Sequence, residues 1–509
     1  MERKPMGRLV ILHTNDIHGR HRPILVTKGS STSQTGDSGR TWDEFDREGH
    51  AGGFPALTTA VKRIREKHGP GNVLLVDGGD TFSDDLLGNL TRGEAVIRLM
   101  NSVGYQVMAL GNHDYDYGSE RTRELDEIAE FPMRAANVVD AETHKPFMGD
   151  PTVVLQAAGI RVGFLTLTYH NTGHTGNPEN YEGLEFTDGI EAARQFLPTL
   201  RRRSDLLVVL SHLGSAVDRV LARDLPQMDL IIGAHSHDRI SSERIGDVTL
   251  VQAVSDGSVL GEIKVDFDGT RRWNVESHLH TLWLTEYPED EEMARQVEAL
   301  RAPYQDILEE AIAYAAEPVG RNYRSESPFD KLVAEIMRAE TGADIGFMPG
   351  VGYGVTLHPG PITREALYTL IPHPAKLVTM RLTGDLVLKI LEQSATNQAP
   401  SDPRKIVGGL LQTAGLRWSI DLTKASGHRV SGVYVRGEPI DISRSYFIAT
   451  NAGMARGLHR YKGFTKGQDT VIHDVQVNEL VERIFGKIGA VRPPRLGDIT
   501  VYGADRVSP

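Results

Sequence analysis

The sequence predicts an α/β protein, and three observations carry this prediction. Short apolar runs alternate with amphipathic segments over residues 9–284. Each run is four to six residues long, rich in Leu or β-branched residues, and closely followed by polar residues or glycine. The composition, 39% hydrophobic and 24% charged, is that of a globular protein rather than a disordered one. Buried strands that alternate with helices are the signature of the α/β class.

The expected strands follow one another at intervals long enough for helices to connect them. They are Leu9–Leu12, Val73–Val76, Val107–Leu110, Val162–Leu167, Leu206–Leu210 and Leu230–Ile232. Amphipathic segments such as Ala56–Lys67 and Glu94–Val103 lie between them and predict helices. The 509 residues allow two to four domains at about 150 residues each. We assign residues 1–285 to the first domain.

Residues 29–53 interrupt this alternation with a polar, aperiodic stretch that is rich in Ser and Thr. A surface insertion is the simplest interpretation. Because the stretch follows His18 closely, a lid over a nearby site is the alternative.

The chain beyond residue 285 predicts a connector and a second domain. Residues 286–317 are rich in Glu, Ala, Gln and Leu and predict a helical linker. Residues 318–509 form the second domain. We expect helices over Pro328–Thr341 and Gly384–Ser394, a Gly-rich stretch over Pro349–Gly360, and strands over Leu411–Ile420, Gly432–Val435 and Tyr446–Thr450.

Composition excludes several classes of function. The net charge is −12 and no basic run of useful length occurs, which argues against nucleic-acid coating or membrane-surface binding. No stretch approaches the roughly 18 apolar residues of a membrane span. The run Leu9–Leu12 is too short for a secretory leader, which favours the cytoplasm; a trimmed leader would instead make the protein periplasmic or secreted. The chain has no Cys but 19 His, so any metal ligands must be His, Asp, Glu or Asn.

Polar motifs follow the predicted strands at the point where each one ends. They are Asp16-Ile17-His18, Gly79-Asp80, Gly111-Asn112-His113-Asp114, Ser211-His212 and Gly233-Ala234-His235-Ser236-His237. A single His after a strand is more often a surface or capping residue than a ligand. Five such motifs are hard to explain by packing, because buried charges and imidazoles need a partner or a metal. Since ligands gather at the carboxyl ends of strands, we expect these residues to converge.

The residue types favour a two-metal site. Two divalent ions about 3.5–4 Å apart require a bridging carboxylate together with neutral nitrogen and carbonyl ligands. Carboxylate, imidazole and amide ligands without sulfur suit Mn²⁺ or Zn²⁺, with Fe²⁺ or Co²⁺ as further options.

These motifs resemble those of the calcineurin-like metallophosphoesterases, specifically the branch of bacterial 5′-nucleotidases and UDP-sugar hydrolases. The resemblance rests on His13-Thr14-Asn15-Asp16-Ile17-His18-Gly19, Gly78-Gly79-Asp80 and Gly111-Asn112-His113-Asp114-Tyr115-Asp116-Tyr117-Gly118, and it extends over nearly the whole chain. It implies a four-layer α/β/β/α first domain and an α/β substrate-recognition domain. It also implies hydrolysis of a phosphoester, expected to be a nucleotide, by a hydroxide shared between two metals.

The resemblance assigns seven metal ligands. One ion would be held by Asp16, His18, Asp80 and His237, and the other by Asp80, Asn112, His212 and His235, with Asp80 bridging. The family often has Gln at the position of His237 and Gly at that of Ala234, but both replacements are compatible with the site.

The resemblance also assigns a catalytic pair. His113 matches the non-ligand His that contacts the phosphate, and Asp116 matches the acid that orients it. A carboxylate keeps an imidazole charged near neutral pH, which suits stabilisation of the transition state or the leaving group. We interpret Asp114 as structural and His13 as a packed or supporting residue.

The second domain departs from the nucleotidase pattern where the substrate is recognised. Ser327–Arg338 and Leu411–Trp418 resemble that domain's opening helix and central strand. However, Met348–Gly354 replaces the segment that ends in a substrate-binding Arg, and Arg456–Phe464 replaces the late Gly-Gly-Asp-Gly-aromatic motif. The candidates for a rebuilt base-stacking, anion-binding pocket are Tyr353, Arg460, Tyr461 and Phe464.

These departures leave several functions open beside the 5′-nucleotidase. One is a thiosulfohydrolase-like enzyme, because the pattern Pro349-Gly350 with Gly354 resembles that group of the superfamily. Another is a phosphodiesterase acting on UDP-sugars or cyclic nucleotides. A nucleotide-binding or metal-binding module without turnover is the non-enzymatic alternative.

Overall fold

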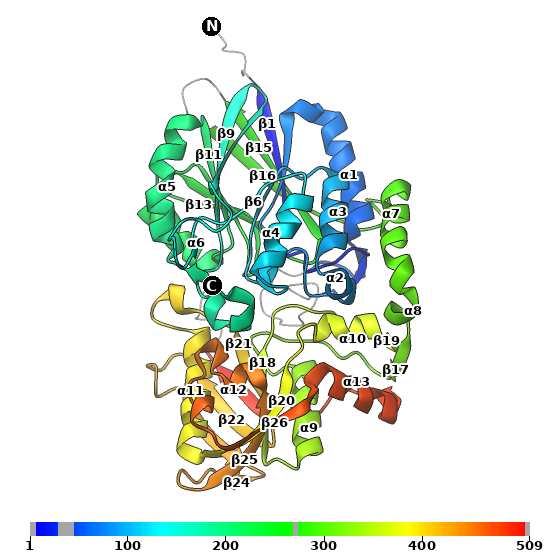
Figure 1. Ribbon diagram of the computed structural model, residues 1–509, viewed down its shortest axis with the longest axis vertical. Helices are drawn as coiled ribbons and strands as arrows, with labels where there is room; N and C mark the ends of the chain where they lie inside the picture. The colour runs from blue at the N-terminus through cyan, green and yellow to red at the C-terminus, as the bar shows by residue number, and fades with distance from the viewer. Residues whose placement is uncertain (1–6, 29–44, 268–272, 504–509) are drawn as a thin grey trace. The chain divides into compact units, whose positions relative to one another are not determined.

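The computed structural model describes residues 7–28, 45–267 and 273–503 (Figure 1). The chain folds into two compact units that divide between Tyr304 and Gln305. Most of the 29–53 insertion, and with it the lid hypothesis, lies outside the described residues. Its last part forms the short strand β3 (Gly49–Ala51), which pairs with β2 (Ile24–Val26).

None of the helices that the structure describes is long and apolar enough to cross a membrane. The cytoplasmic location stays a prediction from the sequence.

Two six-stranded sheets form the centre of the first unit. The first sheet runs in the order β16 (Trp273–Thr281), β15 (Val259–Phe267), β1 (Arg8–Thr14), β4 (Val73–Asp77), β5 (Val107–Ala109) and β6 (Met133–Arg134). The second runs β13 (Arg239–Ile245), β14 (Val248–Ala253), β12 (Leu230–Gly233), β11 (Leu206–Ser211), β9 (Ile160–Leu167) and β8 (Thr152–Ala157). All six strands that the sequence predicts in this part of the chain are present.

The alternation of side chains along the strands shows that the sheets are stacked. In β1, Leu9 and Ile11 pack in one cluster with residues of the second sheet such as Phe164 and Val208. Their neighbours Val10 and Leu12 belong to a different cluster, together with the helices of the first sheet. Because successive residues of a strand point to opposite faces, β1 must be covered on both sides.

Helices cover the two outer faces (Figure 1). Helices α1 (Gly53–His68), α3 (Glu94–Val103) and α7 (Glu291–Arg301) pack on the first sheet. Helices α5 (Gly189–Arg203) and α6 (Ser215–Asp224) pack on the second. The predicted four-layer α/β/β/α architecture is confirmed, and α3 has the bounds that the sequence predicts.

Parallel strands bring the predicted motifs to one edge. Strands β1, β4, β5 and β6 run parallel in the first sheet, and β9, β11, β12 and β14 run parallel in the second. The carboxyl ends of parallel strands share an edge of their sheet, where ligands of α/β proteins are bound.

The second unit is also α/β. Its largest sheet has the order β21 (Gly409–Ala414), β18 (Ile345–Gly350), β25 (Ser445–Asn451), β20 (Lys376–Thr383) and β26 (Gln468–Gln476). A second sheet contains β24 (Glu438–Pro439), β23 (Val430–Val435), β22 (Leu416–Asp421) and β28 (Ile499–Tyr502). A third contains β19 (Gly360–Thr363), β17 (Ala311–Ala315) and β27 (Ala490–Val491). The principal helices are α9 (Pro328–Thr341), α11 (Gly384–Gln398) and α13 (Val477–Ile488).

Helix α9 is confirmed at both ends by capping residues. Ser327 accepts a hydrogen bond from the backbone N–H of Asp330, and Pro328 occupies the first helical position. Gly342 ends the helix with a φ of 68°, a left-handed conformation that glycine adopts without strain.

Two expectations differ from the structure. The predicted connector 286–317 is not one helical linker: α7 packs with the first unit, whereas β17 pairs with β19 and β27 in the second. The predicted strand Leu411–Ile420 is two strands, β21 and β22, in different sheets. Gly415 separates them with a φ of 74°, and a Cβ there would lie 2.4 Å from the carbonyl oxygen of Asp344. Apolar alternation alone cannot reveal such a break.

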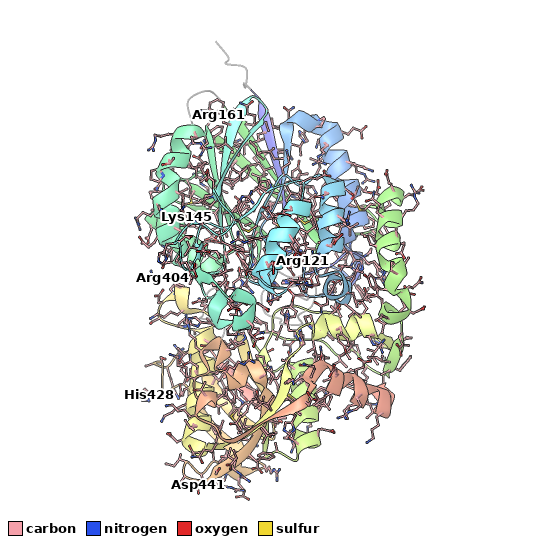
Figure 2. All side chains as sticks on the ribbon, in the orientation of Figure 1. Arg121, Lys145, Arg161, Arg404, His428 and Asp441 are labelled. Atoms are coloured by element: carbon pink, nitrogen blue, oxygen red, sulfur yellow. The ribbon has the colours of Figure 1, made fainter. Side chains whose placement is uncertain are left out.

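Surface charges are paired locally. Arg161 lies 2.9 Å from Asp205, and Arg404 lies 3.0 Å from Asp402. Figure 2 labels the two arginines. Exposed pairs of this kind contribute only about 0–1 kcal/mol each to the free energy of unfolding.

Candidate metal centre and active site

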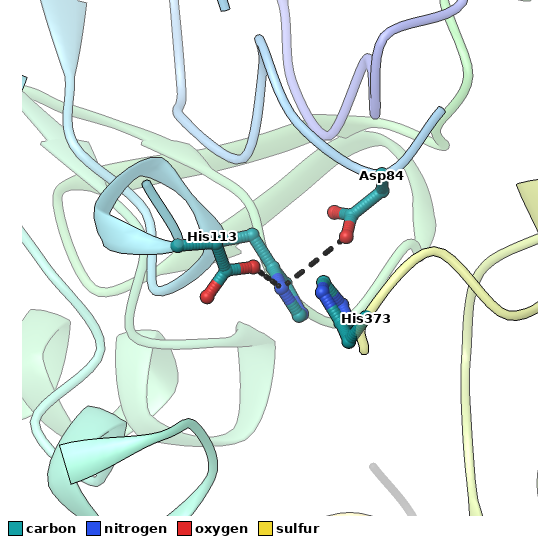
Figure 3. A group of neighbouring side chains, drawn as sticks. Asp84, His113 and His373 are labelled. Atoms are coloured by element: carbon teal, nitrogen blue, oxygen red, sulfur yellow. Dashed lines mark hydrogen bonds and ion pairs between the residues drawn. The ribbon is translucent and has the colours of Figure 1, made fainter. Parts of the chain in front are cut away.

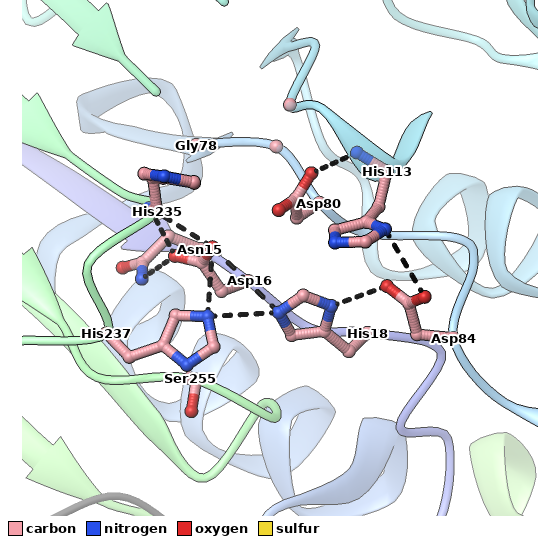
Figure 4. Close-up of polar contacts among 12 residues, drawn as sticks. Asn15, Asp16, His18, Gly78, Asp80, Asp84, His113, His235, His237 and Ser255 are labelled. Carbon is pink, nitrogen blue, oxygen red and sulfur yellow. Dashed lines mark hydrogen bonds and ion pairs between the residues drawn. The ribbon is translucent and has the colours of Figure 1, made fainter. Parts of the chain in front are cut away.

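The predicted ligands lie just beyond the carboxyl ends of the parallel strands. Asp16 and His18 follow β1, Asp80 follows β4, and Asn112 follows β5 in the first sheet. His212 follows β11, and His235 and His237 follow β12 in the second sheet. Figure 4 shows Asp16, His18, Asp80, His235 and His237 facing a common centre. Six of the seven predicted ligands come together in two groups, and the assignment of all seven as metal ligands stays a prediction.

Asp16, His18 and His237 form the first ligand group. The Nε2 atoms of His18 and His237 lie 3.1 Å apart, and the Nε2 of His237 lies 3.4 Å from Oδ1 of Asp16. All three side chains are buried. Two imidazole nitrogens that face each other beside a buried carboxylate fit a shared cation.

Asp80, His212 and His235 form the second ligand group. The Nε2 of His212 lies 3.0 Å from Oδ2 of Asp80 and 3.8 Å from Oδ1 of Asp16, so the two groups adjoin. Burial lowers the pKa of His235 to about 3, which keeps this imidazole neutral, as a ligand must be.

Backbone and carboxylate contacts orient these ligands. The Nδ1 of His212 lies 2.8 Å from the carbonyl oxygen of Gly78 and donates there, so Nε2 is the nitrogen directed at the centre. Burial lowers the pKa of His212, but the carboxylates of Asp80 and Asp16 more than offset this and raise it to about 9. Asp16 accepts hydrogen bonds from the side chain of Asn15 and from the backbone N–H of His235. Such outer contacts set the tautomer and direction of metal ligands.

The turns that carry the ligands have an unusual backbone. Positive φ angles occur at Asp16 (52°), His18 (49°), Asp80 (56°), His235 (71°) and His237 (55°). Residues other than glycine rarely adopt this left-handed conformation, which costs about 1–3 kcal/mol per residue and is concentrated at functional sites. The fold therefore maintains five strained positions in one small region.

Asn112 supplies a direct test of whether a cation fits. Its Oδ1 is buried and has no hydrogen-bond partner among the residues that the structure describes. A buried carbonyl oxygen without a partner costs free energy, but it is a good ligand for a divalent ion. Together with the facing nitrogens of His18 and His237, it shows that these residues fit divalent cations.

His113 and Asp116 form the expected pair at the rim of the centre. The Nδ1 of His113 lies 2.7 Å from Oδ2 of Asp116, and the backbone N–H of His113 donates to Oδ1 of Asp80. Burial lowers the pKa of His113, but Asp84 and Asp116 more than offset this and raise it well above its usual value. The ring is therefore a cation near neutral pH, as the sequence analysis expects.

Asp114 has the structural role that the sequence predicts. Its carboxylate accepts hydrogen bonds from the backbone N–H groups of Asp80, Thr81 and Gly111. It thereby ties the turn after β4 to the turn after β5. His13 is buried against Gly261, and burial lowers its pKa to about 3, as expected for a packed neutral ring.

Two further residues contact the ligands, and the sequence analysis does not single them out. Asp84 lies 2.8 Å from Nδ1 of His18, and Tyr169 stacks on His235 with ring centroids 3.9 Å apart. Tyr169 follows β9, so the rule that selects the other motifs also applies to it. Asp84 lies four residues after Asp80, and only the folded turn brings it back to His18.

The predicted substrate residues of the second unit do not gather in the same way. Tyr461 and Phe464 are each 1% exposed and pack in the hydrophobic core of this unit, where Phe464 contacts Phe347. Neither ring offers a face to a base, which corrects their predicted stacking role. Arg460 donates to the carbonyl oxygen of Lys405, and Tyr353 lies against His373. The roles of Arg460 and Tyr353 stay predictions.

Comparison with known families identifies both parts of the chain. Residues 9–239 match the calcineurin-like phosphoesterase family, and residues 311–466 match the 5′-nucleotidase C-terminal domain. The chain is thus a metal-dependent phosphoester hydrolase by class. It belongs to the calcineurin-like phosphoesterases that carry a 5′-nucleotidase C-terminal domain, and this family implies bound divalent cations.

Individual relatives agree with this assignment. A 5′-nucleotidase of Vibrio cholerae is 26% identical over 90% of this chain and 86% of its own. The trifunctional nucleotide phosphoesterase YfkN of Bacillus subtilis is 26% identical over 89% of this chain, which spans only 34% of that longer protein.

Two solved structures share the fold over nearly the whole chain. A 5′-nucleotidase precursor from Thermus thermophilus is 27% identical, with a TM-score of 0.84, over 97% of this chain and 99% of its own. The sulfate thiohydrolase SoxB of the same organism has a TM-score of 0.85 at 24% identity over 99% of this chain and 98% of its own, a likeness of fold alone.

Proposed function

We propose that this protein is a 5′-nucleotidase-like phosphohydrolase that uses two divalent ions to release phosphate from nucleotides or closely related phosphoesters. The main support for this proposal is the pair of adjoining ligand groups, Asp16/His18/His237 and Asp80/His212/His235, with the cationic His113 beside them. A binding module has no need of a charged imidazole held by a carboxylate at the edge of such a centre.

The two ions would be held by the residues that the sequence assigns. Asp16, His18 and His237 would hold the first ion, and His212, His235 and Asn112 the second, with Asp80 between them. When bound, such ions supply Lewis acidity, activate water and neutralise phosphoryl charge. The absence of sulfur ligands favours Mn²⁺ or Zn²⁺, with Fe²⁺ or Co²⁺ as further candidates.

His113 would act on the substrate directly. Its Nδ1 is engaged by Asp116, so Nε2 is the atom that can donate to a phosphoryl oxygen or to the leaving oxygen. Asp116 orients the ring and keeps its proton in place. Asp114 fixes the turn that carries Asn112 and His113 by binding the N–H of Gly111. Positioning and electrostatic stabilisation are the main protein contributions to phosphoryl transfer.

The test is hydrolysis by the purified full chain, with Mn²⁺ added, of nucleoside 5′-monophosphates, cyclic nucleotides, UDP-sugars and thiosulfate esters. We expect nucleoside 5′-monophosphates to have the highest kcat/KM, and EDTA to remove the activity reversibly. Tight binding of metal with no hydrolysis of any phosphoester would contradict the proposal.

One observation favours the thiosulfohydrolase-like alternative. The second unit lacks the substrate-binding Arg of nucleotidases in Met348–Gly354, and Tyr461 and Phe464 are in its core. Of the three aromatic residues predicted to stack on a base, Tyr353 alone lies outside this core. Hydrolysis of a thiosulfate ester in preference to every nucleotide would select this alternative.

A further inference from the structure

Asp84 has a buried carboxylate that lies beside the candidate metal centre. Neither the sequence motifs nor the family comparison assigns a role to this residue. Its side chain is fully buried, and its backbone has a φ of 75°. Oδ2 lies 2.8 Å from Nδ1 of His18, and Oδ1 lies 3.5 Å from Nδ1 of His113. Figure 3 shows the carboxylate of Asp84 directed at the ring of His113, and Figure 4 shows its contact with His18.

We propose that Asp84 is a positioning residue that holds two rings at once, the metal ligand His18 and the substrate-facing His113. This inference rests on the proposed function, because it assigns His113 to the substrate and His18 to a metal. Its two oxygens serve different rings, so a single side chain fixes the distance between ligand and catalytic group.

The contact with His18 sets the tautomer of a metal ligand. Because Nδ1 faces a carboxylate at 2.8 Å, the proton of the neutral ring resides on Nδ1. Nε2 then carries the lone pair and points at His237 and Asp16, where the cation would lie. A carboxylate behind a metal-binding His also raises the basicity of the ligand.

The contact with His113 complements that of Asp116. The two carboxylates approach the same nitrogen, Asp116 at 2.7 Å and Asp84 at 3.5 Å. A ring held from two sides cannot rotate away without losing both contacts, so Nε2 remains directed away from the carboxylates. This is the atom through which His113 would reach the substrate.

The backbone of Asp84 argues that its side chain is needed. A φ of 75° is a conformation that glycine adopts freely and that costs other residues about 1 kcal/mol or more. If the position served only to turn the chain, glycine would be the better residue. The chain instead has a carboxylate here, and the carboxylate contacts both rings.

Asp84→Gly separates these two explanations, because it satisfies the backbone and deletes the carboxylate. We expect the variant to fold with a melting temperature no lower than that of the parent. Its affinity for Co²⁺, followed by the visible absorption of the bound ion, should fall about 10–100-fold at one of two sites, the usual cost of losing such an outer contact. His144→Gly is the matched control, since His144 is exposed and has a φ of 53°.

Asp84→Asn keeps the shape and still accepts the hydrogen bond from His18 through its amide oxygen. We expect Co²⁺ affinity within about threefold of the parent, whereas kcat at saturating metal should fall about 10-fold with little change in KM, since the charge beside His113 is lost. If Asp84→Gly does not fold, kcat of this variant tests the role at His113, and Asp84→Ala, which also deletes the carboxylate, tests the role at His18 through Co²⁺ affinity.

Two results would overturn the inference. Unchanged Co²⁺ affinity and kcat in Asp84→Gly would reduce Asp84 to a turn residue, and unchanged kcat in Asp84→Asn would remove its role at His113. Failure of the proposed function is distinguishable, because the parent would then bind Co²⁺ without hydrolysing any phosphoester. The Co²⁺ titration would still decide whether Asp84 holds His18.

Discussion

The two units differ in how well their sequence-predicted site residues agree with the structure. In the first unit, six predicted ligands from four separate turns form two compact groups, as the contacts of His18 with His237 and of Asp80 with His212 illustrate. In the second unit, Tyr461 and Phe464 lie in the core. Metal binding allows only a few residue types at the strand ends, so those residues are informative in the sequence. An aromatic residue in a loop is less informative, because it can equally well pack in the core or stack on a substrate.

Asp80→Asn should give the largest effect, because it weakens the carboxylate that is expected to serve both ions. The loss of metal-based stabilisation is worth several kcal/mol, so kcat/KM should fall by about 10³-fold or more. Hydrolysis at several Mn²⁺ concentrations, together with metal content, measures this. Asp205→Asn, which alters an exposed ion pair with Arg161, is the matched control. Activity equal to that of the parent would remove Asp80 from the centre.

His113→Ala should slow turnover while leaving both ions bound. The loss of a general acid or electrostatic stabiliser typically costs about 10²–10⁴-fold in kcat. Steady-state kinetics and metal analysis of the same preparation measure the two quantities. Loss of an ion would show instead that His113 is a ligand. The number of metal ligands in the first unit would then be eight rather than seven.

Phe464→Ala sharpens the comparison from the side of the second unit. If Phe464 is a core residue, truncation should lower the free energy of unfolding by about 3–5 kcal/mol, with KM almost unchanged below the melting transition. Urea unfolding and nucleotide KM values measure the two effects. Tyr502→Ala, at an aromatic residue that is 56% exposed, should cost much less stability. A raised KM at parental stability would restore the stacking role.

Tyr461→Phe should give the smallest effect, visible only at alkaline pH. Burial raises the pKa of Tyr461 to about 12, whereas the unfolded chain ionises near 10. The contribution of the neutral Tyr461 hydroxyl to the free energy of unfolding is therefore fully present below pH 10 and is lost as the pH rises from 10 to 12. The variant should lack this loss, which is worth about 2–3 kcal/mol at pH 12. Melting temperatures at pH 9 and pH 11 measure it, with Tyr314→Phe, at a 53% exposed position, as the control. Identical pH dependence in Tyr461→Phe and the parent would place the hydroxyl in water.

The sequence predicts the framework of the first unit well because each signal is local. A strand such as β11 is a continuous apolar run with polar residues at its end, and α9 has its capping residues beside it in the sequence. The metal ligands share this property, since His212 and His235 directly follow strands.

What the sequence cannot predict depends on contacts between distant segments. Asp84 reaches His18 across 66 positions, and Tyr169 meets His235 only once β9 and β12 lie in the same sheet. The break at Gly415 depends on the carbonyl of Asp344, which no local pattern contains.

The left-handed turns at the metal centre restrict which mutations the site can accept. Asp, Asn and His are the side chains, besides glycine, that adopt a positive φ with the least strain, whereas β-branched residues almost never do so. Carboxylates and imidazoles are also the groups that bind divalent ions. The left-handed backbone and metal coordination therefore favour the same few residue types at five positions, Asp16, His18, Asp80, His235 and His237. A substitution at any of these five positions must therefore be compatible both with a left-handed backbone and with metal binding, and most residue types fail at least one of these two requirements.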